Sequence, residues 1–378
     1  MSVYGDYLGK ETGKLGFGLM RLPKMADDPS KIDLEATKTM VDLFMEAGLT
    51  YFDTAFVYDQ GDSEIAAGKA LVERYPRDSF TLATKLNAWL GHPSEEEARK
   101  QLDISLERTG AGYFDYYLLH AIQENNYKIY DDYKMWDFVR EMKEAGKIRH
   151  WGFSFHAGPE LLDKLLTEHP DVEFVQLQVN YADWENPSVQ SRALVEVAQK
   201  HKKPFVIMEP IKGGTLANPP ESVKKVFTQA NPNISVASWA IRFAASLDGC
   251  LTVLSGMSTI EQMKDNLSYM KDFHPLSADE YKVIKDAQDA LDALDLIKCT
   301  GCHYCMEGCP VKMDIPNLFT AMNKMLLNDP IGSRGHFGLA TASGTKPSDC
   351  LACGQCEEAC PQSLPIISLL EKCKDTFE

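Results

Sequence analysis

Residues 299–310 read CTGCHYCMEGCP, and residues 350–361 read CLACGQCEEACP. Both stretches have the form C-x₂-C-x₂-C-x₃-C-P, so the second repeats the spacing of the first. Two complete runs of four cysteines, each closed by proline, decide how the C-terminal part of the chain is organised. They contain eight of its ten cysteines: Cys299, Cys302, Cys305, Cys309, Cys350, Cys353, Cys356 and Cys360.

This spacing is the one that bacterial ferredoxins use to bind [4Fe–4S] clusters, with the fourth thiolate usually ligating the other cluster. Zinc sites typically use two C-x₂-C pairs without further cysteines at these spacings, and disulfides need an oxidising compartment. The runs therefore predict two [4Fe–4S] clusters in a reducing, cytoplasmic setting. Of the remaining cysteines, Cys250 is predicted to be a buried free thiol.

The spacer between the runs predicts helices. Forty residues separate Cys309 from Cys350. Within them Pro316 opens a predicted helix over residues 317–327, and a Gly-rich passage follows over residues 332–344. A compact ferredoxin has a shorter, strand-rich spacer, so we expect a mostly helical module.

A long predicted helix over residues 277–295 precedes the first cysteine run. We therefore expect a first domain over residues 1–295 and a small, mostly α-helical, ferredoxin-like domain over residues 296–378. A chain of 378 residues is long enough for one large domain and an appendage of this size.

The first domain alternates short apolar runs with amphipathic segments. The apolar runs predict strands over residues 14–20, 48–52, 80–84, 114–119, 148–153, 174–179, 205–208 and 251–254. Apolar residues that recur every three to four positions predict helices over residues 34–47, 94–108, 133–145 and 190–201. Eight strands that alternate with helices favour an α/β fold of the (β/α)₈ TIM barrel type. No Rossmann-type glycine fingerprint follows the first strand, which disfavours a doubly wound sheet.

Polar residues fall at the ends of three successive predicted strands. The second ends with FDTAFVY at residues 52–58, the third with TK at residues 84–85, and the fourth with LLH at residues 118–120. Active sites of barrels are built at these C-terminal strand ends. In this order the motifs resemble the aldo-keto reductase family over roughly the first 275 residues. The resemblance implies four catalytic residues: Asp53, Tyr58, Lys85 and His120.

Hydride transfer between NAD(P)H and a small-molecule carbonyl or alcohol is the reaction that the resemblance implies. A carbonyl that receives hydride develops negative charge on oxygen and needs a proton donor. Tyr58 would give this proton in reduction and remove it in oxidation. Because a free tyrosine has a pKa near ~10, Lys85 would lower the pKa of Tyr58 by favouring the phenolate. Asp53 would keep Lys85 charged and in place, and His120 would orient the carbonyl.

Two loops are candidates for the nucleotide phosphates, because barrels often bind phosphate after strands 7 and 8 and at a helix N-terminus. The second loop leads into a predicted helix over residues 259–269. The loop candidates are Lys212, Gly213, Gly214, Ser255, Gly256, Met257 and Ser258. By resemblance, further contacts to the nicotinamide or adenine ends come from Ser154, Gln176 and Asn266.

Three positions depart from the best-known pattern of the family. Phe155 stands where an asparagine usually helps to hold the carboxamide, and Met208 stands where an aromatic side chain commonly stacks on nicotinamide. Gln262 is a cofactor-binding candidate at a position where an arginine often grips the 2′-phosphate of NADPH. These departures leave open whether the cofactor is NADP(H) or NAD(H), and whether nicotinamide is used at all.

Aromatic residues on predicted C-terminal loops either line an apolar substrate pocket or pack the loops. These residues are Phe56, Trp89 and Trp184. His156 lies near the predicted mouth of the barrel as a polar loop residue that can touch a ligand. The tryptophans predicted to lie in the core are Trp136, Trp151 and Trp239.

The formal net charge of −16 disfavours nucleic-acid partners, whose binding relies on Lys and Arg contacts to phosphate. It fits either plain solubility or an acidic face for a basic partner. The N-terminus shows no secretory pattern, and no apolar run has the length of a membrane span. We expect a cytoplasmic protein that does not bind membranes.

Three functions remain open from the sequence. In the first, the barrel performs NAD(P)-dependent carbonyl reduction, and the clusters are structural or connect it to an electron-transfer protein partner. In the second, electrons from a ferredoxin-type donor enter through the clusters and reach a substrate without nicotinamide. In the third, the barrel is a nucleotide-sensing regulatory subunit, although a sensor does not need the four polar residues together.

Overall fold

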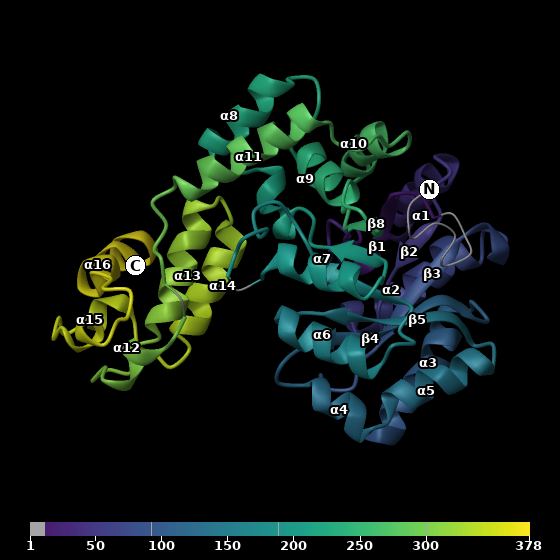
Figure 1. Cartoon of the computed structure of the whole chain (residues 1–378), viewed down its shortest axis with the longest axis horizontal. Helices are drawn as coiled ribbons and strands as arrows, with labels where there is room; N and C mark the ends of the chain where they lie inside the picture. Colours follow the sequence, from purple (N-terminus) through teal and green to yellow (C-terminus); the bar gives the residue numbers. More distant parts are fainter. Residues whose placement is uncertain (1–11, 92, 188, 300) are drawn as a thin grey trace. The chain divides into compact units, whose positions relative to one another are not determined.

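The computed structural model describes residues 12–378 except 92, 188 and 300. These residues form two compact units, drawn in Figure 1. The first unit comprises residues 12–212 and 237–284, and the second comprises residues 213–236 and 285–378. The expected boundary was a single cut between residues 295 and 296. Residues 213–236, with helix α8 (Glu221–Ala230), instead group with the C-terminal part, where the Asn328 amide donates to the carbonyl oxygen of Pro219 at 3.4 Å.

Eight parallel strands close into a barrel in the first unit, in the order of the chain. This confirms the predicted TIM barrel. The strands are β1 (Leu15–Gly18), β2 (Tyr51–Asp53), β3 (Thr81–Leu86), β4 (Phe114–Ile122), β5 (Ile148–Phe155), β6 (Phe174–Gln178), β7 (Phe205–Met208) and β8 (Cys250–Ser255). Each predicted strand overlaps an observed one, and the ends differ by at most a few residues.

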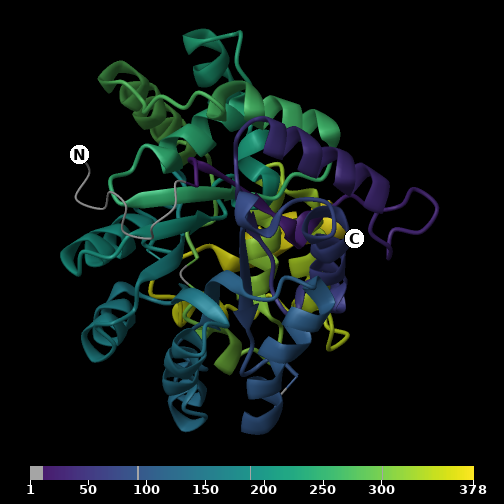
Figure 2. The ribbon, with the colours of Figure 1, turned by 90° about the vertical axis from the view of Figure 1, so that its right-hand side faces the viewer.

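Helices of the first unit surround the strands, as the turned view in Figure 2 also shows. They are α1 (Leu34–Glu46), α2 (Asp62–Ala67), α3 (Glu95–Thr109), α4 (Tyr127–Asp132), α5 (Met135–Glu144), α6 (Pro159–Glu168), α7 (Ser191–Lys200), α9 (Val236–Ala245) and α10 (Ile260–Met270). Local signals fix several of their ends. For example, Ser94 and Glu97 form a capping box at the start of α3, and Gly110 ends it in the left-handed region.

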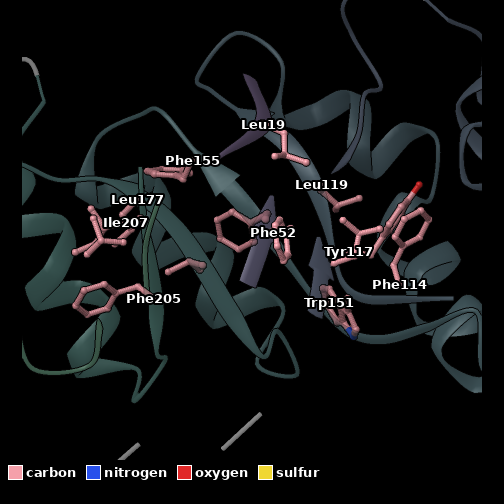
Figure 3. Close-up of a cluster of buried hydrophobic side chains, with 14 of the residues drawn as sticks. Leu19, Phe52, Phe114, Tyr117, Leu119, Trp151, Phe155, Leu177, Phe205 and Ile207 are labelled. Atoms are coloured by element: carbon pink, nitrogen blue, oxygen red, sulfur yellow. The ribbon is translucent and has the colours of Figure 1, made fainter. Parts of the chain in front are cut away.

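Residues along each strand alternate between two buried clusters. One cluster lies inside the barrel and includes Tyr51, Tyr116 and Phe174. The other includes Phe52 and Tyr117, and it extends to apolar residues of the surrounding helices. Part of this larger cluster is drawn in Figure 3. The alternation decides which side chains reach the interior, and therefore which ones can meet at the barrel mouth.

The second unit is built from helices among its described residues. They are α8, α12 (Tyr304–Glu307), α13 (Ile315–Leu326), α14 (Pro330–Ala340), α15 (Gln355–Glu358) and α16 (Ile366–Phe377), together with the end of α11 (Ala278–Asp292). The Gly-rich passage folds as α14, which the sequence did not indicate as a helix. Asp329 caps α14 by accepting from the Gly332 N–H at 2.8 Å, and a Cβ at Gly332 would lie 2.2 Å from this carboxylate. A side chain at position 332 would therefore force the capping carboxylate to shift.

Candidate active site

Polar residues occupy the inward-facing positions where the strands end. On β2, Asp53 lies two residues after Tyr51, and on β3, Lys85 lies two residues after Ala83. Because alternate residues of a strand share a face, both side chains point into the barrel like Tyr51 and Ala83. On β4, His120 lies four residues after Tyr116, so its side chain also points into the barrel. Because β2, β3 and β4 are neighbours in the barrel, the three side chains meet at its C-terminal end. The loop after β2 carries Tyr58, the first residue of the short 3₁₀ helix η2 (Tyr58–Gly61), to the same place.

Lys85 and Asp53 form a buried ion pair. The Lys85 Nζ donates to Asp53 Oδ1 at 2.5 Å and to the Thr54 carbonyl oxygen at 2.7 Å. Burial alone would lower the pKa of Lys85, but the negative Asp53 and the neighbouring Tyr58 outweigh burial, so the pKa of Lys85 is raised. Lys85 is therefore a permanent ammonium group at the barrel mouth.

The half-buried Tyr58 lies against both Lys85 and His120. Its ring centroid lies 4.9 Å from the Lys85 Nζ and 5.6 Å from the His120 ring, which it meets edge to face. Burial raises the pKa of Tyr58, while Lys85 acts in the opposite direction. The expected lowering by Lys85 is thus present, but burial is the larger effect, and the pKa stays above its ordinary value of 10.0. The phenol is protonated at neutral pH and can donate a proton.

His120 is held as a neutral imidazole. Burial lowers its pKa well below 6.5, and the charges of Lys85 and His156 lower it further. Its backbone is fixed as well, since its carbonyl oxygen accepts from Trp89 Nε1 at 3.2 Å and from the Tyr130 hydroxyl. A neutral, fixed imidazole can donate one hydrogen bond to a carbonyl oxygen without adding charge.

A backbone irregularity follows directly after His120. Ala121 adopts a φ of 51°, and the pairing of β4 with β5 shifts between Leu119 and Ile122. The Ala121 N–H donates to Ser154 Oγ at 2.7 Å, which satisfies a backbone donor that the regular ladder would have paired. Ser154, a predicted cofactor contact, therefore also supports the strand end that carries His120.

Gln176 presents an unpartnered oxygen at the inner wall. Its Nε2 contacts the Met208 sulfur at 3.5 Å, while its Oε1 is buried and has no hydrogen-bond partner in the described part of the chain. Both side chains point into the barrel, because each residue lies two positions after an interior residue of its strand, Phe174 or Val206. A buried carbonyl oxygen without a partner is costly unless a ligand supplies a donor.

The loop after β8 is organised by the start of α10. Thr259 caps the helix, Gln262 Oε1 accepts from the Ser258 N–H at 2.8 Å, and Ser258 Oγ donates to the Arg21 carbonyl oxygen at 2.7 Å. Asn266 is satisfied within the helix, since its amide donates to the Gln262 carbonyl oxygen and its Oδ1 accepts from the Tyr269 hydroxyl. The other predicted members of this loop, Ser255, Gly256 and Met257, lie beside β1 and its following turn.

The loop after β7 differs from the expectation. Lys212 forms an ion pair with the buried Asp183, so its charge is already matched. Gly213 and Gly214 both have positive φ, 65° and 108°, and belong to the second unit. The structure therefore places Ser255–Ser258 directly before the start of α10, and it pairs the predicted phosphate contact Lys212 with Asp183.

The eight cysteines of the two runs line two separate hollows in the second unit. The first is lined by Cys299, Cys302, Cys305 and Cys360 together with apolar residues such as Ile315 and Phe319. The second is lined by Cys309, Cys350, Cys353 and Cys356 with Met313 and Leu370. Each hollow takes three thiols from one run and the fourth from the other run. This exchange is the ligand pattern of two-cluster ferredoxins.

Comparison with known proteins identifies both parts of the chain. A model of the aldo/keto reductase family matches residues 14–289, most of the chain. The chain belongs to the aldo/keto reductase family. A model of the 4Fe-4S dicluster domain matches residues 298–364. This aldo/keto reductase therefore carries an iron–sulfur domain after its barrel.

Curated relatives match the reductase at low identity. The uncharacterized oxidoreductase YqkF of Bacillus subtilis is 23% identical over 278 residues, 65% of this chain and 86% of that protein. An aldo-keto reductase of Mycolicibacterium vanbaalenii is 28% identical over 256 residues, 67% of this chain and 83% of that protein.

Solved structures support the same fold. The holo form of aldo-keto reductase AKR11C1 from Bacillus halodurans has a TM-score of 0.59 at 25% identity and covers 72% of this chain and 91% of its own. An aldo-keto reductase from Klebsiella pneumoniae, solved in complex with NADPH, has a TM-score of 0.57 at 21% identity and covers 72% and 89%.

Other predicted residues of this aldo/keto reductase have structural contacts. Phe155, which stands where the family usually has an asparagine, points away from the barrel interior and packs in the large core cluster. Trp89 and Trp184 pack against the same core, and Phe56 lies under the Arg108 guanidinium. His156 lies close enough to His120 to lower the pKa of that imidazole. Core positions of Trp136, Trp151 and Trp239 are confirmed, and so is the buried thiol of Cys250.

Two residues behind the site were missed from the sequence, Glu64 and Arg108. Glu64 is fully buried, accepts from Thr84 Oγ1 at 2.6 Å, and pairs with Arg108 at 3.0 Å. One available signal was the acidic side chain of Glu64 directly before the largely apolar stretch IAAGKAL. Elsewhere, none of the helices in the described ranges combines the length and apolar character that crossing a membrane requires.

Proposed function

We propose that this protein reduces a small-molecule carbonyl, or oxidises the corresponding alcohol, with a nicotinamide nucleotide bound at the barrel mouth. The observation that carries the proposal is the convergence of Asp53, Tyr58, Lys85 and His120 at the C-terminal ends of β2, β3 and β4. When a carbonyl oxygen gains negative charge, it needs a proton donor and groups that stabilise the charge. A protonated phenol beside a fixed ammonium and a neutral imidazole meets both needs.

Each of the four residues has a distinct role in this proposal. The bound dihydronicotinamide supplies the hydride. Tyr58 gives its phenolic proton to the carbonyl oxygen, and Lys85 stabilises the phenolate that remains. His120 orients the same oxygen through a hydrogen bond, and Asp53 fixes Lys85. In the oxidative direction Tyr58 takes the proton from the alcohol.

The residues at the inner wall fit a nicotinamide. Its carboxamide carries N–H donors, and Gln176 Oε1 is a buried acceptor that has no partner among the residues that the structure describes. Ser154 Oγ accepts from Ala121 and retains its own proton for the carboxamide oxygen. The NADPH in the Klebsiella structure supports this cofactor class. Asn266 and Gln262 would need to exchange their present contacts in order to bind the adenine end.

The C-terminal domain is proposed to hold two [4Fe–4S] clusters, one in each cysteine-lined hollow. Clusters move single electrons, whereas the barrel chemistry moves two together. Cys302 and Cys353 are exposed, so each cluster would have one corner near the surface, where an electron-transfer protein can dock. Thiolates of this kind persist in a reducing cytoplasm, which is the compartment that we assign.

Anaerobic turnover tests the carbonyl reductase directly. Reconstituted protein is mixed with NADPH or NADH and a broad panel of aldehydes and ketones, and nucleotide oxidation is followed by absorbance. We expect carbonyl-dependent oxidation that falls by about 10²–10⁴-fold in Tyr58→Phe, the usual range for removing a general acid. Protein that neither binds nucleotide nor consumes it with any carbonyl would disprove the proposal.

The two cysteine-lined hollows favour a second candidate, in which reduced clusters donate electrons to the substrate without nicotinamide. The same reconstituted protein separates the candidates. Nucleotide alone is added, and the cluster absorbance and electron paramagnetic resonance signal are recorded. Unchanged clusters with tight nucleotide binding favour the carbonyl reductase. Chemically reduced clusters that a substrate reoxidises without nucleotide favour the second candidate.

A further inference from the structure

The loop that carries Tyr58 is strained and needs support from outside. Residues 54–61 connect β2 to α2, and three consecutive residues after Tyr58 have positive φ: Asp59 at 48°, Gln60 at 58° and Gly61 at 102°. Two of these carry a Cβ, which makes the left-handed region unfavourable. Such a segment persists only where its surroundings determine it.

Arg108, at the end of α3, contacts this loop on both sides of Tyr58. Its Nη1 donates to the Phe56 carbonyl oxygen at 3.0 Å, and its guanidinium carbon lies 4.4 Å from the Phe56 ring centroid. A Cβ on Gly61 would lie 2.6 Å from the same guanidinium carbon. The guanidinium thus lies between Phe56 and Gly61, which stand on either side of Tyr58 in the loop.

Glu64 connects Arg108 to the strand of Lys85. One carboxylate oxygen accepts from Arg108 Nη1 at 3.0 Å, and the other accepts from Thr84 Oγ1 at 2.6 Å. Thr84 directly precedes Lys85 on β3. These contacts form a continuous chain. It begins at the Phe56 carbonyl in the loop of Tyr58, and it ends at Thr84, next to Lys85 on β3.

We propose that Arg108 is a positioning residue, which acts with Glu64 to hold the 54–61 loop so that the Tyr58 phenol faces Lys85. The proposal rests on the acid–base role of Tyr58 stated above. Arg108 itself does not touch the reacting groups in this arrangement. Its contribution is to keep the phenol in place, because small misplacements at a reacting centre can cost up to about 10²-fold in rate.

A second arginine provides a matched control. Arg77 is exposed to a similar degree, 20% against 23% for Arg108, and it also combines a buried carboxylate, Asp115, with backbone carbonyl oxygens. Asp115 lies near the start of β4, at the opposite end of the barrel from His120. Removing Arg77 therefore breaks the same kinds of contact without touching the Tyr58 loop.

The test compares Arg108→Met, Arg108→Lys, Glu64→Gln and Arg77→Met in the full chain. For Arg108→Met we expect kcat to fall by about 10–100-fold with nucleotide affinity unchanged within about twofold. Arg108→Lys should recover part of the loss, because lysine keeps the charge but not the planar fork. Arg77→Met should keep the wild-type kcat even if its thermal stability falls as much as that of Arg108→Met.

A readout independent of turnover separates this inference from the proposed function. The protein is labelled with 3-fluorotyrosine, and the Tyr58 fluorine signal is assigned by its loss in Tyr58→Phe. We expect the signal to shift in Arg108→Met and Glu64→Gln, but not in Arg77→Met. If Arg108→Met is too unstable to purify, Arg108→Lys and Glu64→Gln carry the same expectation.

Wild-type kcat together with an unchanged Tyr58 signal in the Arg108 and Glu64 variants would overturn the positioning role while leaving the reductase function intact. Absence of carbonyl turnover in the wild type would instead reject the proposed function, and the fluorine signal would still decide whether Arg108 positions Tyr58.

Discussion

The Lys85 Nζ lies 2.5 Å from Asp53 Oδ1, and the two side chains are 0% and 3% exposed. The second carboxylate oxygen, Asp53 Oδ2, is buried and accepts no hydrogen bond from any of the described residues. A fold that needed only stability would gain little from this pair, since burying two charges costs about as much as their attraction returns. The pair is better explained by its place beside Tyr58, where it keeps one positive charge fixed in a site shielded from water.

Asp53→Asn is therefore expected to be strongly destabilising. The substitution leaves the Lys85 ammonium buried without its counter-charge, which typically costs about 3–5 kcal/mol. Urea unfolding followed by tryptophan fluorescence measures this in the barrel alone, because Trp89, Trp136, Trp151, Trp184 and Trp239 all lie in the first unit. Asp53→Asn with Lys85→Met should recover part of the loss, whereas Asp163→Asn, which breaks a surface pair with Lys200, should change little. Equal effects of Asp53→Asn and Asp163→Asn would contradict the buried-pair account.

The pH dependence of turnover should follow the raised pKa of Tyr58. Because burial keeps this pKa above 10.0, the phenol stays protonated through neutral and mildly alkaline pH. We expect carbonyl reduction to lose rate only as pH rises beyond that value, and alcohol oxidation, which needs the phenolate, to increase with pH. In Lys85→Met, which removes the charge that opposes burial, the alkaline limb should move to higher pH. Profiles of kcat in both directions measure this, and a reduction limb near neutral pH would be inconsistent with Tyr58 as the acid.

Acid stability should depend on His120. Its pKa in the folded protein is well below 6.5, so the unfolded chain takes up a proton at this position as pH falls through 6.5 while the folded protein does not. The free energy of unfolding therefore decreases with falling pH, by at most about 1.4 kcal/mol per pH unit for this one group. In His120→Asn this part of the slope should disappear. Unfolding at a series of pH values between 7 and the acid transition is the measurement, with the exposed His274→Asn as the control. A slope that is the same in His120→Asn and wild type would mean that His120 is not held neutral.

Much of the barrel and of the four-residue site could be predicted because it rests on local patterns. Apolar runs identified every strand, and the polar residues at the strand ends were identified from motifs that resemble the aldo-keto reductase family. Tertiary contacts decided the rest. The ion pair of Lys212, a predicted phosphate contact, with Asp183 was not indicated by the sequence. The burial of Phe155 in the large core cluster also depends on contacts that the sequence pattern did not indicate. The support of Tyr58 by Arg108 joins residues fifty positions apart, which no spacing rule indicates.

The exchange of cysteines between the two runs gives a prediction about iron content. Cys360 belongs to the second run in the sequence but lines the hollow of Cys299, Cys302 and Cys305. With two [4Fe–4S] clusters the wild type should contain about eight iron atoms per chain, and Cys360→Ser should contain about four. Since Cys302 and Cys360 line one hollow, their double serine variant should also retain about four.

Cys302→Ser combined with Cys353→Ser removes one ligand from each hollow and should retain almost no iron. Cys373→Ser is the control, because Cys373 is buried on α16 and lines neither hollow. Iron analysis of the anaerobically reconstituted variants distinguishes exchange of the fourth ligand between the runs from binding of one cluster by each run. If each run bound its own cluster, the Cys302 and Cys360 double variant would lose both clusters, and the ligand exchange would be wrong.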